Sequence, residues 1–401
     1  MKRYLAAIIV CAACAFTANA QGRDWMTDNG DAQRSAWIRS DAKINKDSMA
    51  KPGFQFLWKL KLKNPPRQLN SLSPPATLDR LIGYRGFRML GFVSGSSGNL
   101  FAIDTDLGRM EWDKHLNSGA PAGPGTLTCP GGMTTGVARP ALTTIPALPS
   151  GGGRGRSSPA KSAVGEPGQG AVTLANVRPN PPGGGGGNPM LVQPTRTNPA
   201  NPPGGQLGAG PFLVFALAGD GKLHSLHMSN GADHEPPMKF LPPNANANGL
   251  IVTDQFAYVV TAGGCGDVAN GVWAIDLISK EVRTWKGNVA GSAGMAFGGD
   301  GVIYVVTGAG GDHPNSLVAL DPKTLAMKAS FSAGAQEFSS SPVIFDYKGK
   351  TLIAAATRNG SLHLFDAANL NVPLTSTPAS SKTADFAPGA LASWQDPSGT
   401  R

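Results

Sequence analysis

Short runs of alternating hydrophobic and polar residues recur along this 401-residue chain, each opened by a turn residue and most closed by an aspartate. Alternation with a period of two is typical of a β-strand that is buried on one face, and glycine, asparagine and aspartate at its ends indicate turns. Five such runs occur, at 98–104, 221–227, 271–276, 315–321 and 360–366. The pattern predicts a strand in each of these places.

The spacing between these runs is nearly constant. From His227 to Asp276 is 49 residues, and the next two steps, to Asp321 and to Asp366, are 45 residues each. A further apolar stretch precedes each run, and another short strand follows its closing turn, which makes about four strands per repeat. A repeat of this length and content predicts an all-β fold, a β-propeller of four-stranded blades.

The number of repeats predicts about five to six blades, as in an incomplete seven- or eight-bladed ring. Residues 386–394 are expected to form the first strand of a sixth blade, and residues 395–399 resemble a hairpin turn. Eight repeats of this length would not fit beside the other segments of the chain. We therefore expect a ring with a gap, which exposes strand edges and associates through them.

One stretch differs in composition from the rest. Residues 146–211 contain runs of glycine and repeated Asn-Pro and Pro-Pro pairs, with almost no aromatic residue. Such a segment cannot bury enough apolar surface to offset the entropy lost on ordering, which predicts a disordered insertion. We therefore divide the chain into a signal peptide (1–20), an N-terminal lead with the first blades (21–145), the insertion (146–211) and further blades (212–401).

The first twenty residues have the layout of a secretory signal peptide. Lys2 and Arg3 precede an apolar run at 5–16, and Ala-Asn-Ala at 18–20 forms a small-residue cleavage site before Gln21. The apolar run is shorter than the roughly 20 residues that a membrane-spanning helix needs, and no later stretch qualifies as a transmembrane segment. We expect a periplasmic or secreted protein that is cleaved near Ala20–Gln21.

Charge and histidine placement exclude two classes of function. The formal net charge is +9, but much of the excess lies in the 146–211 insertion, and no cluster of Lys and Arg is interleaved with aromatic residues. The sequence therefore predicts no nucleic-acid partner. His224 and His227 are three residues apart, which places them on opposite faces of an expected strand, so no metal site is predicted there.

Two cysteines, Cys129 and Cys265, remain once the signal peptide has removed Cys11 and Cys14. Exported proteins readily form disulfides, but spacing alone does not fix a pairing. Both possibilities stay open: a disulfide between Cys129 and Cys265, or two buried thiols.

The repeat signature resembles the blade motif of quinoprotein β-propellers, Ala-x-Asp-x-x-Thr-Gly-x-x-x-Trp. The matching residues are Ala102, Asp104, Gly108 and Trp112 in one repeat, Ala274, Asp276 and Trp285 in another, and Ala319, Asp321 and Asp366 in the last two. The opening Trp25, Gly30 and Arg34-Ser35 is similar to the start of pyrroloquinoline-quinone (PQQ) dehydrogenases. The motif has a structural role: the aspartate fixes a turn, and the tryptophan packs between neighbouring blades.

The resemblance implies two kinds of function. The superfamily includes PQQ- and calcium-dependent alcohol or sugar dehydrogenases, and also an outer-membrane assembly lipoprotein that binds no cofactor. The dehydrogenases often carry an adjacent Cys-Cys pair, which this sequence lacks, and no set of residues here matches their calcium ligands or base, so no catalytic or cofactor-binding residue is assigned. We expect a binding or scaffold module that takes a protein, glycan or small ligand through its loops. The alternative is a PQQ- and Ca²⁺-dependent dehydrogenase or a fragment of one.

Overall fold

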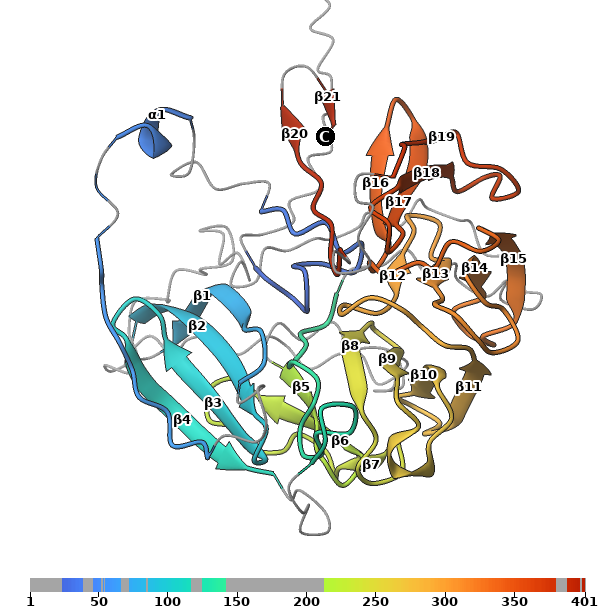
Figure 1. Ribbon diagram of the computed structural model, residues 1–401. Coiled ribbons are helices and arrows are strands. Elements are labelled where there is room, and N and C mark those ends of the chain that lie inside the picture. The colour runs from blue at the N-terminus through green and yellow to red at the C-terminus, as the bar shows by residue number, and fades with distance from the viewer. Residues whose placement is uncertain are drawn as a thin grey trace, which may run out of the picture.

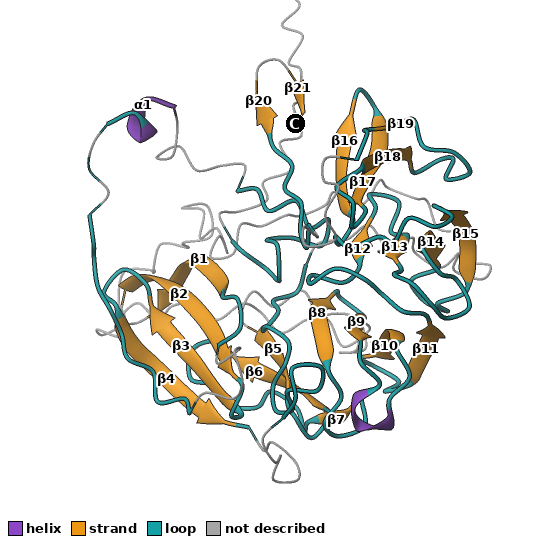
Figure 2. Cartoon of the chain, viewed as in Figure 1, coloured by secondary structure: helices purple, strands orange, loops and turns teal. Residues whose placement is uncertain are grey.

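The computed structural model describes residues 24–38, 46–51, 53, 55–65, 72–83, 86–116, 125–141, 213–379, 388–396 and 399–400 (Figure 1). The expected signal peptide and the whole of the 146–211 insertion lie outside these residues. Nearly all regular structure in the described part is β-strand (Figure 2). The all-β propeller of four-stranded blades that the repeats predict is confirmed.

Five antiparallel sheets form the blades, and their strands follow one another in chain order. The first blade holds β1 (Ala76–Gly83), β2 (Gly86–Gly95), β3 (Asn99–Asp104) and β4 (Arg109–His115). The second holds β5 (Leu213–Leu217), β6 (Lys222–His227) and β7 (Met238–Lys239). The third holds β8 (Ala247–Val252), β9 (Phe256–Thr261), β10 (Gly271–Asp276) and β11 (Val282–Lys286).

The last two blades are built in the same way. The fourth holds β12 (Ala296–Phe297), β13 (Ile303–Val306), β14 (Ser316–Leu320) and β15 (Met327–Ser332). The fifth holds β16 (Val343–Tyr347), β17 (Lys350–Ala356), β18 (Leu362–Asp366) and β19 (Thr375–Ser376). The first strand of each of these blades faces the axis and the last lies outermost (Figure 1).

The innermost position of the second blade is occupied by Ala138, which precedes the insertion in the sequence. Ala138 pairs antiparallel with Phe215 of β5 through two backbone hydrogen bonds, of 3.0 and 2.7 Å. Beyond this bridge, Ala141 donates to the Val252 carbonyl of β8 at 2.7 Å, so the chain passes from the second blade to the third. In the sequence, the predicted insertion at 146–211 falls between the paired residues Ala138 and Phe215, outside the described part of the chain.

The regular structure outside the blades is short. It comprises helix α1 (Lys46–Met49), a 3₁₀ turn at Cys265–Asp267, and a hairpin of β20 (Gln395–Asp396) and β21 (Gly399–Thr400). The hairpin agrees with the turn expected at 395–399. The strand expected at 386–394 is not found in its described part, residues 388–394. Instead this stretch bonds to loops at the axis, where Ser341 donates to Gly389 and Ser393 donates to Ser35.

The hydrophobic core is divided among the contacts between successive blades. Four buried clusters lie between blades one and two, two and three, three and four, and four and five. Phe92, Phe215, Phe297 and Phe365, all fully buried, belong to these clusters. Burial of such side chains contributes about 25 cal/mol per Å² of apolar surface, so these faces supply most of the stability.

The five blades form an open arc. No buried cluster of the described residues joins the fifth blade to the first. Figure 1 shows the space between β1–β4 and β16–β19 crossed by loops and by the β20–β21 hairpin. The gap in the ring that the repeat count predicts is therefore present in the described part of the chain.

Candidate functional site at the propeller axis

The aspartates of the repeat signature stand at strand ends and hold the turns that follow. Asp104 and Asp276 are the last residues of β3 and β10, Asp366 ends β18, and Asp321 follows β14 directly. Each accepts backbone hydrogen bonds from the next turn, as where the amides of Ile278 and Ser279 donate to Asp276 Oδ1 at 2.8 and 3.0 Å. These carboxylates are therefore structural.

The signature tryptophans reach from one blade to the next. The indole of Trp112, on β4, donates to the carbonyl of Met228 at 2.7 Å and lies against Gly231, both in the second blade. Trp285, on β11, stacks on His313 in the fourth blade, with ring centroids 6.0 Å apart. Ala102, Ala274 and Ala319 are buried in the clusters between blades. The motif thus lies in the blade contacts and not at the axis.

The axis is occupied by residues 24–35, which we call the axial segment (blue, near the centre of Figure 1). It touches the innermost strand of every blade. Its backbone contacts are Trp25 with Thr77 of β1, Met26 with Arg139 of the second blade, Ala32 with Phe297 of β12, and Gln33 with Ile344 of β16. Thr27 donates to Leu250 of β8. One segment therefore ties all five blades together.

Arg34 is the centre of this arrangement and is fully buried. Its guanidinium donates to the carbonyls of Met295 and Gly249, both at 2.8 Å, and to that of Asp28 at 2.5 Å. Burial lowers the pKa of Arg34 to about 10, against the opposing effect of Asp28 and Asp31, so it remains charged at neutral pH. A buried cation with this many backbone acceptors fixes the third and fourth blades relative to the axial segment.

Beside the axial segment lies a cavity of about 730 Å³, which we call the axial cavity. Its side chains are mostly apolar or uncharged and polar. The lining includes Trp25, Asp28, Asn29, Ile38, Leu72, Ser96, Leu127, Met133, Thr134, Asn246, Asn248 and Ser292. Among the lining residues that the structure describes, Asp28 is the one with an ionisable side chain. The volume is within the usual range for a small-molecule site.

Three polar side chains in the lining have no hydrogen-bond partner among the described residues. The Ser96 hydroxyl is buried, with a residue exposure of 5%, and is unpaired. The side-chain amides of Asn29 and Asn248 likewise make no hydrogen bond to the described part of the chain. Ser96 is buried, and Asn29 and Asn248 are half-buried, so these unpaired groups in the cavity lining are available to a ligand.

Asp28 lies at the floor of the cavity beside Gly136, whose lack of a side chain leaves room for the carboxyl. Removal from water raises the pKa of the Asp28 carboxyl, and the Arg34 charge and the Gly249 amide only partly offset this. Arg34 lies beneath it with its donors committed to carbonyl groups. The floor therefore presents one carboxyl group, whose charge Arg34 partly offsets.

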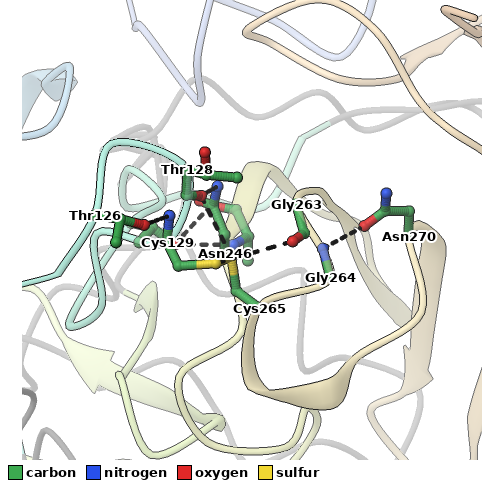
Figure 3. Close-up of a disulfide and its surroundings, with 10 residues drawn as sticks. Thr126, Thr128, Cys129, Asn246, Gly263, Gly264, Cys265 and Asn270 are labelled. Carbon is green, nitrogen blue, oxygen red and sulfur yellow. Dashed lines mark hydrogen bonds between the residues drawn. A yellow bond between two sulfur atoms is a disulfide. The ribbon is translucent and has the colours of Figure 1, made fainter.

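One wall of the cavity is secured by a disulfide between Cys129 and Cys265, with Cα atoms 5.4 Å apart (Figure 3). It joins the loop that contributes Leu127 and Pro130 to the cavity to the β9–β10 loop of the third blade. Asn246 reinforces the junction by donating to the Thr128 carbonyl at 2.9 Å. Of the two possibilities that the sequence leaves open, the structure has the paired one.

The chain matches known proteins by its fold but not by its sequence. No protein-family model matches the chain, and no curated protein is similar to it in sequence. Solved structures do match. The quinohemoprotein alcohol dehydrogenase from Comamonas testosteroni is similar with a TM-score of 0.53 and 16% identity, over 93% of this chain and 53% of that one. The chain has the fold of the quinoprotein β-propellers.

Two other solved structures also match the chain at low sequence identity. A europium-containing methanol dehydrogenase matches with a TM-score of 0.50 and 11% identity, over 88% of this chain and 58% of that one. BamB from Moraxella catarrhalis matches with a TM-score of 0.32 and 12% identity, over 72% and 70%, a likeness too weak to bear on function. The chain spans about half the length of the two dehydrogenases, and at these identities the likeness concerns the fold alone.

The axial cavity of this quinoprotein-type propeller does not fit PQQ and calcium. PQQ is a tricarboxylate, and the described residues of the lining offer a carboxyl group and no Lys, Arg or His. Calcium takes six or more oxygen ligands, usually including several carboxylates. The described residues hold no group of three or more His, Cys, Asp and Glu side chains that could bind a metal. No reaction step through these groups is therefore derived.

The repeats did not point to the residues that build this site. Trp25 and Arg34 stand out in the sequence as part of the opening motif, but Asn29, Ser96, Asn246 and Asn248 carry no signal. His224, on β6, bonds to Asp233 at 3.0 Å. Within the described part of the propeller, no helix has the length and hydrophobicity to cross a membrane.

Proposed function

We propose that this quinoprotein-type propeller is an exported, non-catalytic binding module whose axial cavity takes a small, uncharged, polyhydroxylated ligand of the glycan type. The observation that carries the proposal is the composition of the cavity lining. The described lining combines hydroxyl and amide side chains with aliphatic side chains and prolines, one aromatic ring and one carboxyl group, around a volume of about 730 Å³.

The unpaired polar groups favour a ligand rich in hydroxyls. The side chains of Asn29, Ser96 and Asn248 can each both donate and accept a hydrogen bond, as a hydroxyl group can. A ligand that buries these side chains without bonding to them would bind more weakly, because an unpaired buried polar group costs about 1–3 kcal/mol. The Trp25 ring, backed by Gly30, offers an apolar face for the carbon skeleton of a sugar ring.

The charge distribution argues against an anionic ligand. Asp28 is the ionisable group of the lining, and Arg34 already compensates it from below. An anion would therefore meet no cation to offset its loss of hydration. A ligand with a single positive charge would meet one carboxyl group, Asp28, whose charge Arg34 already partly offsets.

Export is part of the same proposal. The N-terminal residues 1–20 have the pattern of a signal peptide, and Cys129 and Cys265 are paired, as is common outside the cytoplasm. A binding module of this kind would meet glycans or glycan fragments in the periplasm or beyond the cell. Mass spectrometry of the mature protein, with an N-terminus at Gln21, tests this part.

A panel of neutral mono- and oligosaccharides, screened by isothermal titration calorimetry, tests the ligand class. We expect at least one to bind, and Asn248→Ala and Ser96→Ala each to weaken it about tenfold, because each removes one hydrogen bond to the ligand. Asn371→Ala, at an exposed position on the fifth blade, is the matched control and should leave the affinity unchanged. Saturable binding of PQQ with Ca²⁺, and of no saccharide, would refute the proposal.

A further inference from the structure

The stretch of chain at 55–65, which we call the rim segment, lies along the outside of the first blade (Figure 1). It is held at both ends. The Trp58 indole donates to the Thr105 carbonyl at 2.8 Å beyond one end of β3, and Ser97 donates to the Pro65 carbonyl at 2.6 Å near the other. Six residues of extended chain cover about 20 Å, which matches the length of β3 and its turn.

Burial along the rim segment alternates as it does in a β-strand. Trp58, Leu60 and Leu62 are half-buried, whereas Lys59, Lys61 and Lys63 are exposed. This period of two places the three lysines on one face, about 7 Å apart, with the apolar side chains on the other. The segment therefore has the side-chain pattern of a strand that presents a row of positive charge.

The backbone of this segment is not used by the rest of the molecule. The amides and carbonyls of residues 59–62 make no hydrogen bond to any residue that the structure describes. Lys59, Lys61 and Lys63 likewise form no ion pair within the described ranges. An extended backbone with free donors and acceptors is the arrangement that accepts an added strand.

Two apolar side chains extend the same surface. Phe56 and Leu57 are each 80% exposed, more than any other large hydrophobic residue in the described part of the chain. They lie directly before the alternating stretch. Exposed apolar side chains beside an open strand edge are typical of an interaction site.

We propose that the rim segment binds an extended, acidic segment of a partner protein by strand addition. Residues opposite one another on neighbouring strands lie about 5 Å apart, so acidic residues at alternate positions of the partner would face Lys59, Lys61 and Lys63. Apolar residues between them would cover Leu60 and Leu62, and an apolar end would meet Phe56 and Leu57. A second copy of this chain fits poorly, because its own lysines would face these three.

The test uses a synthetic peptide in which glutamate alternates with valine, followed by a phenylalanine, titrated into the full chain by fluorescence anisotropy. We expect saturable binding that weakens with salt, together with slower amide exchange at residues 59–62. The triple variant Lys59→Glu/Lys61→Glu/Lys63→Glu should weaken binding at least about tenfold, because three favourable cross-strand pairs become repulsive.

Two controls separate strand addition from charge alone. The triple variant Lys239→Glu/Lys286→Glu/Lys328→Glu makes the same change in net charge on the outer strands of the second, third and fourth blades, and should bind normally. A peptide of the same sequence with N-methylated amides on its pairing edge keeps its charge and should fail to bind. Equal binding of the methylated peptide, or no loss in the first triple variant, overturns the proposal.

Further measurements on the same variants distinguish a membrane surface or a second copy of the chain as the binding partner of the rim segment. Competition by phosphatidylglycerol vesicles as strong as by free peptide would assign the lysines to a membrane surface. A concentration-dependent dimer in sedimentation that the first triple variant abolishes would assign them to a second copy. Either outcome contradicts strand addition by a partner.

Discussion

The contacts between blades and the axial segment hold the same five blades together by different means. Between blades, four apolar clusters repeat the same residue types, and each joins only two neighbours. At the axis, one non-repeating segment makes polar contacts with every blade. A blade contact can be repacked locally, whereas a polar network around one buried cation fails as a unit. The relative placement of the blades and the cavity therefore depend most on the axial segment.

Substitution of Arg34 should have the largest effect. Arg34→Leu leaves the carbonyls of Met295 and Gly249 and the Asp28 carboxyl without their buried partner, which should lower the free energy of unfolding by about 3–5 kcal/mol. Urea denaturation measures this. The matched control is Arg88→Leu in the first blade, where Glu111 keeps Arg109 at 3.4 Å, so a smaller loss is expected. Equal losses in both variants would contradict the special role of the axis.

Removal of the disulfide should have the second-largest effect on the free energy of unfolding. In the double variant Cys129→Ser/Cys265→Ser, the unfolded chain regains the freedom of a loop that spans 136 positions, so the free energy of unfolding should fall by about 2–4 kcal/mol. Thermal unfolding under non-reducing conditions measures the change. Ligand affinity should fall as well, because the wall that carries Leu127 and Pro130 loosens. A variant with wild-type affinity would show that this wall does not shape the site.

Truncation of a signature tryptophan should lower the free energy of unfolding by less than removal of the disulfide does. Trp112→Ala removes a half-buried ring and its hydrogen bond to Met228, so we expect a loss of roughly 2–3 kcal/mol. Trp112→Phe should recover part of it by restoring apolar contact. Because the ring lies between two blades and away from the cavity, saccharide affinity should not change in either variant. A loss of affinity would mean that blade contacts and the axis are coupled.

Mild acidification should have a smaller effect, through the fifth blade. Burial lowers the pKa of His363 below its ordinary value of 6.5, so the unfolded chain binds protons more readily than the folded one. Stability is then complete above pH 6.5 and falls as the pH drops from there toward the folded-state pKa. His363→Gln, which does not titrate, should show a flatter dependence in denaturant melts between pH 7 and 5. Identical profiles would remove His363 as the cause.

Deletion of the insertion should have the smallest effect. In the sequence, the insertion falls between Ala138 and Phe215, which pair with each other in the second blade. A short Asn-Gly turn in place of the insertion should leave the midpoint of thermal unfolding nearly unchanged, because long surface loops add little to the free energy of folding. The segment is predicted to be disordered, and a fall of many degrees would show that it packs on the propeller.

The blades could be predicted from the sequence because they repeat. Asp104, Asp276 and Asp321 mark strand ends through local turn chemistry, and Trp112 and Trp285 mark the contact to the next blade, so pattern and spacing were sufficient. The expected strand at 386–394 was wrong in its described part. Its apolar pattern competes with hydrogen bonds to Ser35 and Ser341, which are distant in sequence.

The site could not be predicted in the same way. Asn29, Ser96 and Asn248 come from the axial segment, the first blade and the third, and they meet only because the blades converge on one axis. A single polar residue in a turn or strand carries no sign of whether it faces solvent or a shared cavity. Even Arg34, which the opening motif makes conspicuous, gives no hint of the carbonyl groups more than 200 residues away that bind it.

Equilibrium dialysis distinguishes directly between a propeller that binds neutral saccharides and one that binds PQQ with Ca²⁺. The full chain at high concentration is dialysed against a mixture of neutral oligosaccharides and PQQ with Ca²⁺, and mass spectrometry measures what each compartment retains. We expect the protein compartment to be enriched in an uncharged saccharide, Asn248→Ala to remove the enrichment, and PQQ to stay evenly distributed. Stoichiometric retention of PQQ with no retained saccharide would contradict the proposed function.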